Sequence, residues 1–404
     1  MKKIFSTLFI AILLVSCSEF EEDLKFDTPS YKQLTVENVE TDLPVINITA
    51  DEDEVAEMLK NYRDEIEIEA HFDLYRNKEL KIDNELIELE VKGGRSATFA
   101  LKSLGIKFDD SVDNDERQLI NPEKVKSNHS IEKVKSIRLR NSGNDFYDTM
   151  LKDASYTELA ISLDLDFELT YYEPAYVFLN KEYYGMLNIR TESNSHGVSK
   201  LFGKKKKNVT MVKINSPGEI EIKDGDEARV YSLLDKIEQK DITGLKEEID
   251  ISSFIDYMAF ESLIDNFDWP NNNVRFYAID EGKFRFVLYD LDYVNEIDVE
   301  DDPMETINNG NSSAMIDLFN VLYTDQEFKT AYDARIREIF KDSRFSREAF
   351  SAIIHKNMEA IEKDIPAHLE KYNNPETLIE WYQNVDNLKA GYNDRFEALK
   401  EYLN

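Results

Sequence analysis

The sequence predicts an α+β fold with a β-rich N-terminal part and a helical C-terminal part. Between residues 44 and 91, three segments alternate apolar and polar residues, which is the period of a half-buried strand. From Ser313 onward the apolar residues instead recur about every 3.6 positions, which is typical of packed helices. The 404 residues are 42% apolar and 11% aromatic, enough for one large core or two ordinary ones, which argues against disorder of the whole chain.

The charge of the chain limits its partners. Its formal net charge is −33. Long-range repulsion would oppose binding to a nucleic-acid backbone or to an anionic membrane surface, so we expect no nucleic-acid partner. The acidic balance favours solubility and cation binding.

Residues 1–17 predict the signal peptide of a lipoprotein. Lys2 and Lys3 precede an apolar stretch, residues 4–15, that is too short for a lasting transmembrane span. Residues 14–17 read LVSC, which matches a bacterial lipobox, so Cys17 would be lipidated and become the first mature residue. Cys17 is the only cysteine, which excludes intrachain disulfides and multi-cysteine metal sites. We expect a protein held at the outer membrane or cell surface through this lipid alone.

Three further regions follow the predicted signal peptide. Residues 18–42 are polar and acidic without a sustained period, so they predict a tether between the lipid and the folded body. Residues 43–312 form the predicted core, with the first strands at residues 44–48, 65–74 and 86–91. Residues 313–404 form a predicted helical part packed on that core, in which Met315, Leu318, Phe319 and Leu322 begin the periodic series.

Between these regions the pattern predicts shorter elements. Gly93 and Gly94 indicate a turn between two strands, of which the second covers residues 98–102 and 106–108. The remaining expected segments are a charged, exposed excursion at 110–126, a helix at 146–160, and a hairpin whose strands are 176–179 and 184–189. The basic block at residues 204–207 is interpreted either as a solvated loop tip or as a phosphate-contacting loop.

Residues 265–292 concentrate the ionisable chemistry of the chain. Asp268 and Asn273 lie five apart in a loop that is followed by two six-residue strands, a four-residue turn between them, and Asp290. At ~3.3 Å per residue the first strand leads ~20 Å away and the second returns, so Asp290 should end beside the loop. Trp269 is expected to anchor the loop by packing beneath it. Two carboxylates and an amide thus converge, which resembles the arrangement that protein kinases use around Mg-ATP.

Several segments, in order, resemble the spore-coat protein kinase family called CotH, whose members share an atypical, divergent protein-kinase fold. The strongest match is residues 266–292, which resemble the family's Asp-Trp-Pro-x-Asn-Asn loop, aromatic hairpin and Asp-x-Asp ending. Residues 93–108 are similar to its glycine turn and lysine-bearing strand, residues 137–140 to the segment that follows, and residues 179–186 to its asparagine-turn-glycine hairpin. The resemblance covers the chain from about Leu43 to the C-terminus.

This resemblance implies transfer of phosphate from ATP to serine or threonine of a protein substrate, with Mg²⁺ or Mn²⁺. Position by position, it implies that Asp268 is the catalytic carboxylate, that Asn273 and Asp290 bind the metal, and that Lys102 contacts phosphate. Asp292 would support the metal or cap the following turn. In phosphoryl transfer the protein mainly positions the reactants and neutralises the phosphate charge. A metal ion held by oxygen ligands and one ammonium group are sufficient for this.

One departure from the family and two other functions stay open. Where many relatives have Arg-Glu-Lys, this chain has Arg190-Thr191-Glu192, and a one-residue shift on a strand reverses the face. We therefore expect Glu192 to point away from the site unless a bulge restores it. The first alternative function is a non-catalytic, surface-anchored binding or structural lipoprotein on the same fold. The second is a nucleotidyl transferase that moves AMP with the same carboxylates.

Other metal sites have less support in the sequence. The five histidines lack metal-ligand spacing, so we expect no zinc site. The acidic cluster at residues 298–302 lacks the twelve-residue calcium pattern, and a solvated turn is the preferred interpretation.

Overall fold

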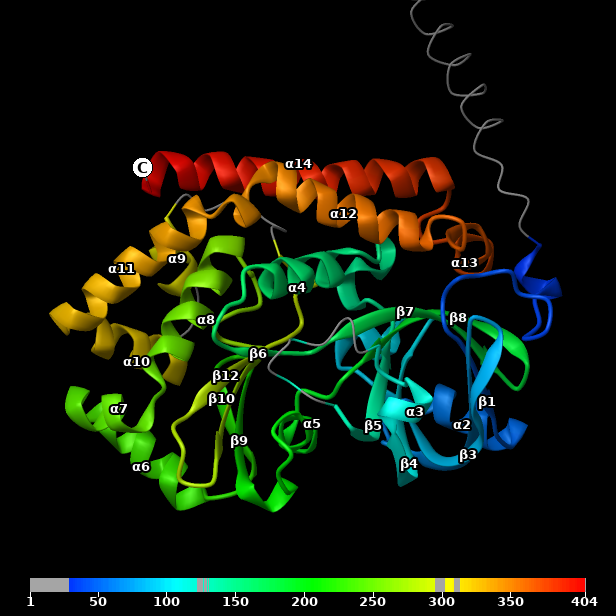
Figure 1. Cartoon of the computed structure of the whole chain (residues 1–404), viewed down its shortest axis with the longest axis horizontal. Coiled ribbons are helices and arrows are strands. Elements are labelled where there is room, and N and C mark those ends of the chain that lie inside the picture. Colours follow the sequence, from blue (N-terminus) through cyan, green and yellow to red (C-terminus); the bar gives the residue numbers. More distant parts are fainter. Residues whose placement is uncertain are drawn as a thin grey trace, which may run out of the picture.

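The structure is a computed structural model that describes residues 29–121, 126, 129, 131–294, 302–308 and 313–403. The predicted signal peptide with Cys17, and residues 18–28 of the predicted tether, lie outside the described residues. The predicted α+β fold is confirmed, with strands in the N-terminal part and helices in the C-terminal part (Figure 1). No helix in the described part of the chain combines the length and the apolar character needed to cross a membrane.

The first layer is a closed barrel of seven strands. Its order is β1 (Val45–Thr49), β2 (Glu67–Arg76), β3 (Glu79–Lys92), β4 (Ser103–Asp113), β5 (Lys133–Arg140), β8 (Glu182–Arg190) and β7 (Tyr172–Leu179), which returns to β1. Every neighbouring pair is antiparallel except β1 and β7. Alternate residues of β2, such as Phe72 and Leu74, are fully buried, as the interior of a small barrel requires. The strands expected at residues 44–48, 65–74 and 86–91, and the hairpin at 176–189, are confirmed.

A second sheet of five strands lies beside the barrel. Its order is β10 (Glu219–Asp224), β9 (Val209–Asn215), β11 (Val274–Ile279), β12 (Arg285–Leu288) and β6 (Glu168–Leu169). Strands β11 and β12 pair antiparallel, so the predicted hairpin is confirmed, with β12 shorter than expected. This hairpin brings the segment after β12 back toward the loop before β11.

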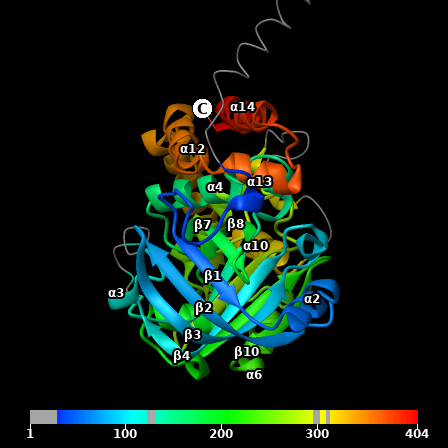
Figure 2. The same cartoon turned by 90° about the vertical axis from the view of Figure 1, so that its right-hand side faces the viewer.

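Helices cover both layers. They are α2 (Glu52–Lys60), α3 (Asn114–Arg117), α4 (Lys152–Ser162), α5 (Ser195–Leu201), α6 (Glu227–Glu238), α7 (Ile242–Glu248), α8 (Ile251–Ile264), α9 (Pro303–Asn308), α10 (Ala314–Tyr323), α11 (Gln326–Lys341), α12 (Arg347–Ile361), α13 (Ile365–Tyr372) and α14 (Leu378–Leu403). Short 3₁₀ turns are η1 (Tyr31–Gln33), η2 (Arg95–Thr98), η4 (Gly143–Tyr147), η5 (Lys206–Asn208) and η6 (Ser343–Phe345). The helical period predicted from Ser313 is confirmed, and Figure 2 shows α12 to α14 above the barrel strands.

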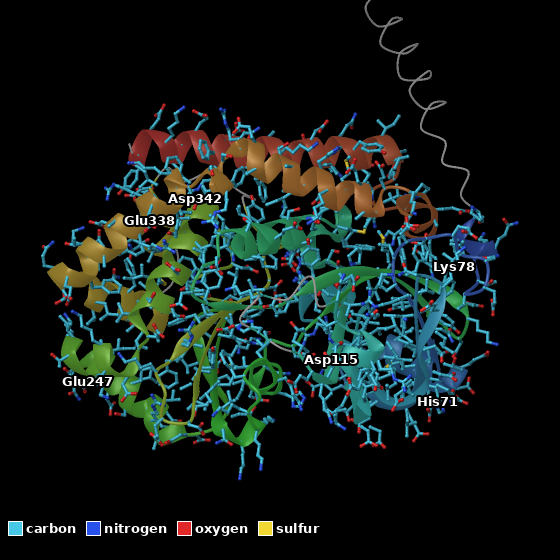
Figure 3. All side chains as sticks on the ribbon, viewed as in Figure 1. His71, Lys78, Asp115, Glu247, Glu338 and Asp342 are labelled. Carbon is cyan, nitrogen blue, oxygen red and sulfur yellow. The ribbon has the colours of Figure 1, made fainter. Side chains whose placement is uncertain are left out.

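Helix α8 was not predicted, although it is the central helix of the fold. Every residue from Ser253 to Ile264 is buried, and the helix packs against α11, α14 and β12. A helix that is buried on all sides has no amphipathic period, so the spacing of its apolar residues does not reveal it. On peripheral elements, by contrast, charged side chains such as Lys78, Asp115, Glu247 and Glu338 are exposed (Figure 3).

The predicted start of the folded body at residue 43 is too late. Leu34 and Val39 are buried in the core. Ser30 Oγ and the Tyr31 amide both donate to the carboxylate of Glu370 on α13, at 2.7 and 3.0 Å. A few isolated apolar residues anchor this segment without any period, which is why its sequence resembles a tether.

Two other expected elements are also wrong. The excursion at residues 110–126 is not simply exposed, because Leu119 and Ile120 are buried and the Lys126 ammonium donates to the backbone carbonyls of Leu165 and Phe167, at 2.7 and 2.9 Å. Residues 98–102 are not a strand, because the glycine turn continues into η2 and β4 begins only at Ser103.

Candidate functional site

The loop of residues 265–273 joins α8 to β11 and is held from beneath. Helix α8 ends at Ile264, and the next residue, Asp265, has a φ of 55° that turns the chain out of the helix. Trp269 is 2% exposed and packs edge-on against Tyr257 of α8, with ring centroids 6.2 Å apart. The predicted packing role of Trp269 is confirmed. With its middle fixed, the loop presents Asp268 and Asn273 at its surface.

Asp268, Asn273 and Asp290 come together as the hairpin argument predicts. The Asn273 Nδ2 donates to Asp268 Oδ2 at 3.3 Å. Burial, and then the negative charge of Asp290, raise the pKa of Asp268 above its usual range, which places Asp290 close to the loop. The structure thus brings these three side chains to one place, while their catalytic and metal-binding roles stay predictions.

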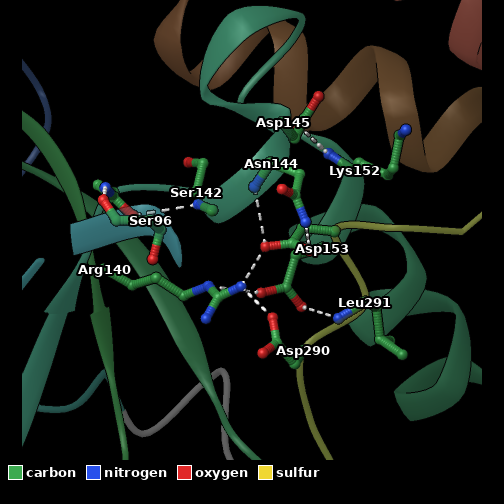
Figure 4. Close-up of polar contacts among 12 residues, drawn as sticks. Ser96, Arg140, Ser142, Asn144, Asp145, Lys152, Asp153, Asp290 and Leu291 are labelled. Carbon is green, nitrogen blue, oxygen red and sulfur yellow. Dashed lines mark hydrogen bonds and ion pairs between the residues drawn. The ribbon is translucent and has the colours of Figure 1, made fainter. Parts of the chain in front are cut away.

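Arg140, at the end of β5, connects this group to the barrel. Its Nη2 donates to both Asp290 and Asp292, and its Nε lies 3.3 Å from Asp153 Oδ2 at the start of α4 (Figure 4). Arg190, at the end of β8, pairs with the same Asp153 carboxylate. Burial alone would raise the pKa of Asp153, but the two guanidinium groups hold it below its usual range.

Asp292 is enclosed rather than presented to a ligand. It is 3% exposed, and its two oxygens accept from the Asn144 amide and the Asn144 Nδ2, each at 3.1 Å, in addition to Arg140. Gly143 has a φ of +60°, and a Cβ there would lie 1.6 Å from Asp292 Oδ2. Burial, and then Asp290, raise the pKa of Asp292 well above its usual range. These contacts favour the supporting role for Asp292 over direct metal ligation.

Lys102 is not brought to the other predicted site residues. Its ammonium donates to the carbonyls of Ala97 and Phe99, at 2.7 and 3.0 Å, and lies 4.4 Å from the ring centre of Tyr62. Lys102 therefore closes the turn after η2. The cation that does reach the aspartates is Arg140, which the sequence argument missed, although an arginine in an alternating buried strand was a usable signal.

Glu192 reaches the site, contrary to the expectation that a shifted carboxylate turns away. Strand β8 ends at Arg190, so strand alternation no longer sets the direction of Glu192. The Glu192 side chain is 8% exposed, and its Oε2 lies 3.5 Å from Arg138 Nη2.

A small cavity of about 30 Å³ lies among these charges. It is lined by Arg138, Arg140, Asp153, Thr170, Arg190, Thr191, Glu192, Ser193, Tyr289 and Asp290. This volume suits about one water molecule, whereas ligand pockets usually have roughly 300–1,000 Å³. The cavity is therefore too small to enclose a nucleotide. A wider groove of about 710 Å³ lies between β10, α6 and α10, where Ser313 Oγ donates to the carbonyl of Pro270 in the loop at 3.3 Å.

The donor set fits a hard divalent cation. Carboxylate and amide oxygens of Asp268, Asn273 and Asp290 are the ligand types that Mg²⁺ and Mn²⁺ prefer. Because the Asn273 NH₂ donates to Asp268, the amide oxygen of Asn273 is the atom left for a cation. Within the described residues, no group of three His, Cys, Asp or Glu side chains could hold a metal ion by itself. A cation here would therefore depend on the amide and on substrate oxygens as well.

Two other candidate sites have less support. The basic block at residues 204–207 is exposed, and Lys206 pairs with Asp224 at 3.0 Å, which favours the solvated-loop interpretation. The acidic cluster at 298–302 lies outside the described residues except for Asp302, whose carboxylate accepts from the Met304 amide at 2.7 Å and caps α9.

Comparison with known proteins identifies the family. A family model described as CotH kinase protein matches residues 89–399, which span the chain from β3 to α14 and include all of the site residues above. A search of curated proteins found no match. The family match covers well over half of the chain, and the chain therefore belongs to the CotH kinase protein family.

Proposed function

We propose that this protein is a CotH-like atypical kinase that transfers phosphate from ATP to serine or threonine of a protein substrate. The observation that supports this proposal is the meeting of Asp268, Asn273 and Asp290 at one end of the β11–β12 hairpin, inside the region that matches the family. Protein kinases use the same residue types, in the same chain order around a hairpin, to position a hydroxyl and Mg-ATP.

Each residue has a distinct task in this proposal. Asp268 orients the acceptor hydroxyl and takes its proton, and the raised pKa makes it a stronger base than an exposed aspartate. Asn273 and Asp290 hold the cation, Mg²⁺ or Mn²⁺, which when bound neutralises the phosphate charge. Arg140 orients Asp290, and its ion pair with Asp153 of α4 parallels the kinase pair of a strand lysine and a helix glutamate.

The size of the cavity places a condition on this mechanism. Because about 30 Å³ cannot hold a nucleotide, the barrel and the hairpin must move apart before ATP binds. The Arg140 contact with Asp290 spans the two walls, so it is the ion pair that opening must break.

Label transfer tests the proposed activity. Purified protein is incubated with γ-labelled ATP, Mg²⁺ or Mn²⁺, and a generic serine-rich protein. We expect label on protein with the wild type and none with Asp268→Ala, while Glu281→Ala, an exposed carboxylate in the hairpin turn, behaves as the wild type. No transfer, or transfer undiminished in Asp268→Ala, would reject kinase activity. The mass added to the product separates phosphate from AMP transfer.

The small cavity also favours the alternative of a non-catalytic binding protein on the same fold. A thermal titration with Mg-ATP distinguishes the two. A ligand that binds only the folded state increases the free energy of unfolding by mass action, by about 2.7 kcal/mol at a hundredfold excess over Kd. The melting temperature rises as a result. A kinase should show this shift, and a chain that has lost its nucleotide site should not.

The proposed setting is extracytoplasmic, with the mature chain attached to the outer membrane or cell surface through lipid on Cys17. The support is the LVSC sequence at residues 14–17 behind a short apolar stretch. Metabolic labelling with a fatty acid should mark the wild type and not Cys17→Ala. Equal labelling of the two would reject the anchor.

A further inference from the structure

Two cations face each other on the second sheet, close to the cavity. Lys213 of β9 and Arg275 of β11 are directly paired in the antiparallel register, so their side chains lie on the same face. Both are only partly exposed. Like charges directly opposite each other on a sheet are destabilising, and partial burial increases that cost. Such a pair therefore suggests that an anion binds between or beside the two groups.

The Arg275 guanidinium is held in a fixed position. It donates to Ser193 Oγ and stacks over the ring of Tyr289, 4.6 Å from the ring centre. Ser193 and Tyr289 both line the small cavity, together with Asp290. Through Arg275, the cationic pair therefore borders the cavity that Asp290 lines, and the charge of Asp290 also acts on Lys213.

Lys213 lacks a counter-ion in the described part of the chain. Its neighbour on the other side in the register is Glu221, but that carboxylate is bound by Lys223 and by Asn215 Nδ2, the latter at 3.0 Å. Burial, and then Arg275 and Lys223, lower the pKa of Lys213 to about 8, against the opposing effects of Glu221 and Asp290. A half-buried ammonium without a partner is costly to the folded protein and available to a ligand.

Two other cations near the site, Lys102 and Arg140, are already engaged. Lys102 is bonded to two backbone carbonyls, and Arg140 is shared among three carboxylates. Neither can take up a new anion without losing those bonds. Lys213 can, because a lysine ammonium is a compact charge that binds phosphate well.

We propose that Lys213, with Arg275 beside it, binds the terminal phosphate of ATP. This inference rests on the proposed function and deepens it. In the transfer, the bond between the terminal phosphorus and its bridging oxygen breaks, and ADP leaves with the electron pair. The acceptor oxygen bonds to phosphorus, and its proton passes to Asp268. Lys213 neither gains nor loses a covalent bond; it balances the charge of the group in transit.

Nucleotide binding measured by calorimetry tests this assignment. Mg-ATP and Mg-ADP are titrated into the wild type, Lys213→Met and Lys341→Met, the last being an exposed lysine at the end of α11. Losing a charge-assisted contact to phosphate should weaken ATP binding by Lys213→Met roughly tenfold or more and leave ADP binding nearly unchanged. Lys341→Met should match the wild type with both nucleotides, and Lys213→Arg should restore most of the preference for ATP.

The outcomes distinguish this inference from the proposed function. A wild type that binds neither nucleotide overturns both. A wild type that binds ATP, with unchanged ATP affinity in Lys213→Met, overturns only the inference. Equal losses for ATP and ADP would assign Lys213 a merely structural role and would also overturn it.

A second measurement uses the wild type alone, so it does not depend on a variant that folds. Acetic anhydride at pH 8 is applied with Mg-ATP, Mg-ADP or inorganic phosphate, and acetylation is quantified by mass spectrometry. We expect Mg-ATP to protect Lys213 several-fold more than Mg-ADP, with the exposed Lys341 modified equally throughout. Equal protection by ATP and ADP, or protection by inorganic phosphate as strong as that by ATP, would overturn the terminal-phosphate assignment.

Discussion

The charged side chains around the cavity form two groups, one on the barrel side (the barrel wall) and one on the side of the second sheet (the sheet wall). The two groups differ in whether their charges are paired. On the barrel wall, Arg140 and Arg190 converge on the Asp153 carboxylate, which is held ionised. On the sheet wall, the partly buried Asp268 and Lys213 make no ion pair among the described residues, and their pKa values shift toward the uncharged form. The barrel wall has the character of a structural ion-pair network, and the sheet wall that of a ligand-binding surface.

This contrast indicates where chemistry can take place. A buried charge whose partners are complete contributes shape and rigidity, but it has little capacity left for a ligand. A charge that the fold leaves incompletely paired is destabilising until a ligand completes it, which is typical of functional sites. Substitutions on the two walls should therefore differ most in their effect on stability.

Asp153→Ala should give the largest loss of stability. It leaves two buried guanidinium groups facing each other without their shared carboxylate, and breaking a buried pair in this way costs about 3–5 kcal/mol. Urea unfolding followed by circular dichroism measures the change. Asp235→Ala, an exposed aspartate on α6, is the control and should stay within about 0.5 kcal/mol of the wild type. A loss for Asp153→Ala no larger than that of the control would contradict the structural role of the barrel wall.

Gly143→Ala should give the next largest effect, and the chain provides a matched control. Gly143 and Gly203 both have a φ of +60°, so alanine at either position costs about 1 kcal/mol in backbone strain. At Gly143 the new Cβ would also collide with Asp292 Oδ2, 1.6 Å away, whereas at Gly203 nothing lies within 4 Å. We expect Gly143→Ala to lose about 2–4 kcal/mol in the same urea assay and Gly203→Ala only about 1 kcal/mol. Equal losses would mean that Asp292 moves away freely.

The local parts of the site were predictable from the sequence. The spacing of Asp268, Asn273 and Asp290 around the hairpin depends on strand length and turn chemistry within 23 residues, and the hairpin forms as expected. Trp269 could be assigned a packing role for a similar reason, because a large ring among polar residues usually buries its body.

The long-range parts were not predictable. Arg140 and Asp290 are 150 residues apart, and their contact depends on closure of the barrel against the hairpin. Lys213 faces Arg275 only through the register of β9 on β11, which no local pattern specifies. Lys102 was assigned to phosphate through the resemblance of its segment to the family's lysine-bearing strand, whereas its ammonium closes the turn after η2.

The pH dependence of stability that is due to Glu261 tests the electrostatic account of the sheet wall. This α8 residue lies beneath the loop, where burial, with a contribution from Asp290, raises its pKa to about 8, and it accepts from Asn266 Nδ2 at 2.8 Å. Between its ordinary pKa of 4.5 and 8, the folded state holds one more proton than the unfolded chain. The free energy of unfolding should therefore fall as pH rises through that window. Glu261 contributes up to ~1.4 kcal/mol per pH unit to this fall.

Glu261→Gln should remove this pH dependence. Glutamine keeps the shape of the side chain and the acceptor for Asn266 but cannot ionise. The free energy of unfolding of the variant should therefore rise relative to that of the wild type between pH 5 and pH 8, as measured in parallel urea titrations. Other buried carboxyls with raised pKa values, such as Asp145 and Asp364, are present in both proteins and cancel in the difference. Parallel stability curves over this range would show that Glu261 is ionised in the fold, and the electrostatic account of the sheet wall would then be wrong.

Lys206→Met should have the smallest effect and completes the comparison between the walls. Its ammonium pairs with Asp224 at 3.0 Å, but the Lys206 side chain is 54% exposed, and a pair of this kind contributes at most about 1 kcal/mol because water and salt screen it. The variant should unfold at nearly the wild-type urea concentration and transfer label at the wild-type rate. Slower transfer by Lys206→Met, at unchanged stability, would instead support the phosphate-contacting interpretation of the basic block. Lys213 matters in our proposal for the opposite reason, since burial beside a second cation, and not lysine content, makes an ammonium available to a phosphate.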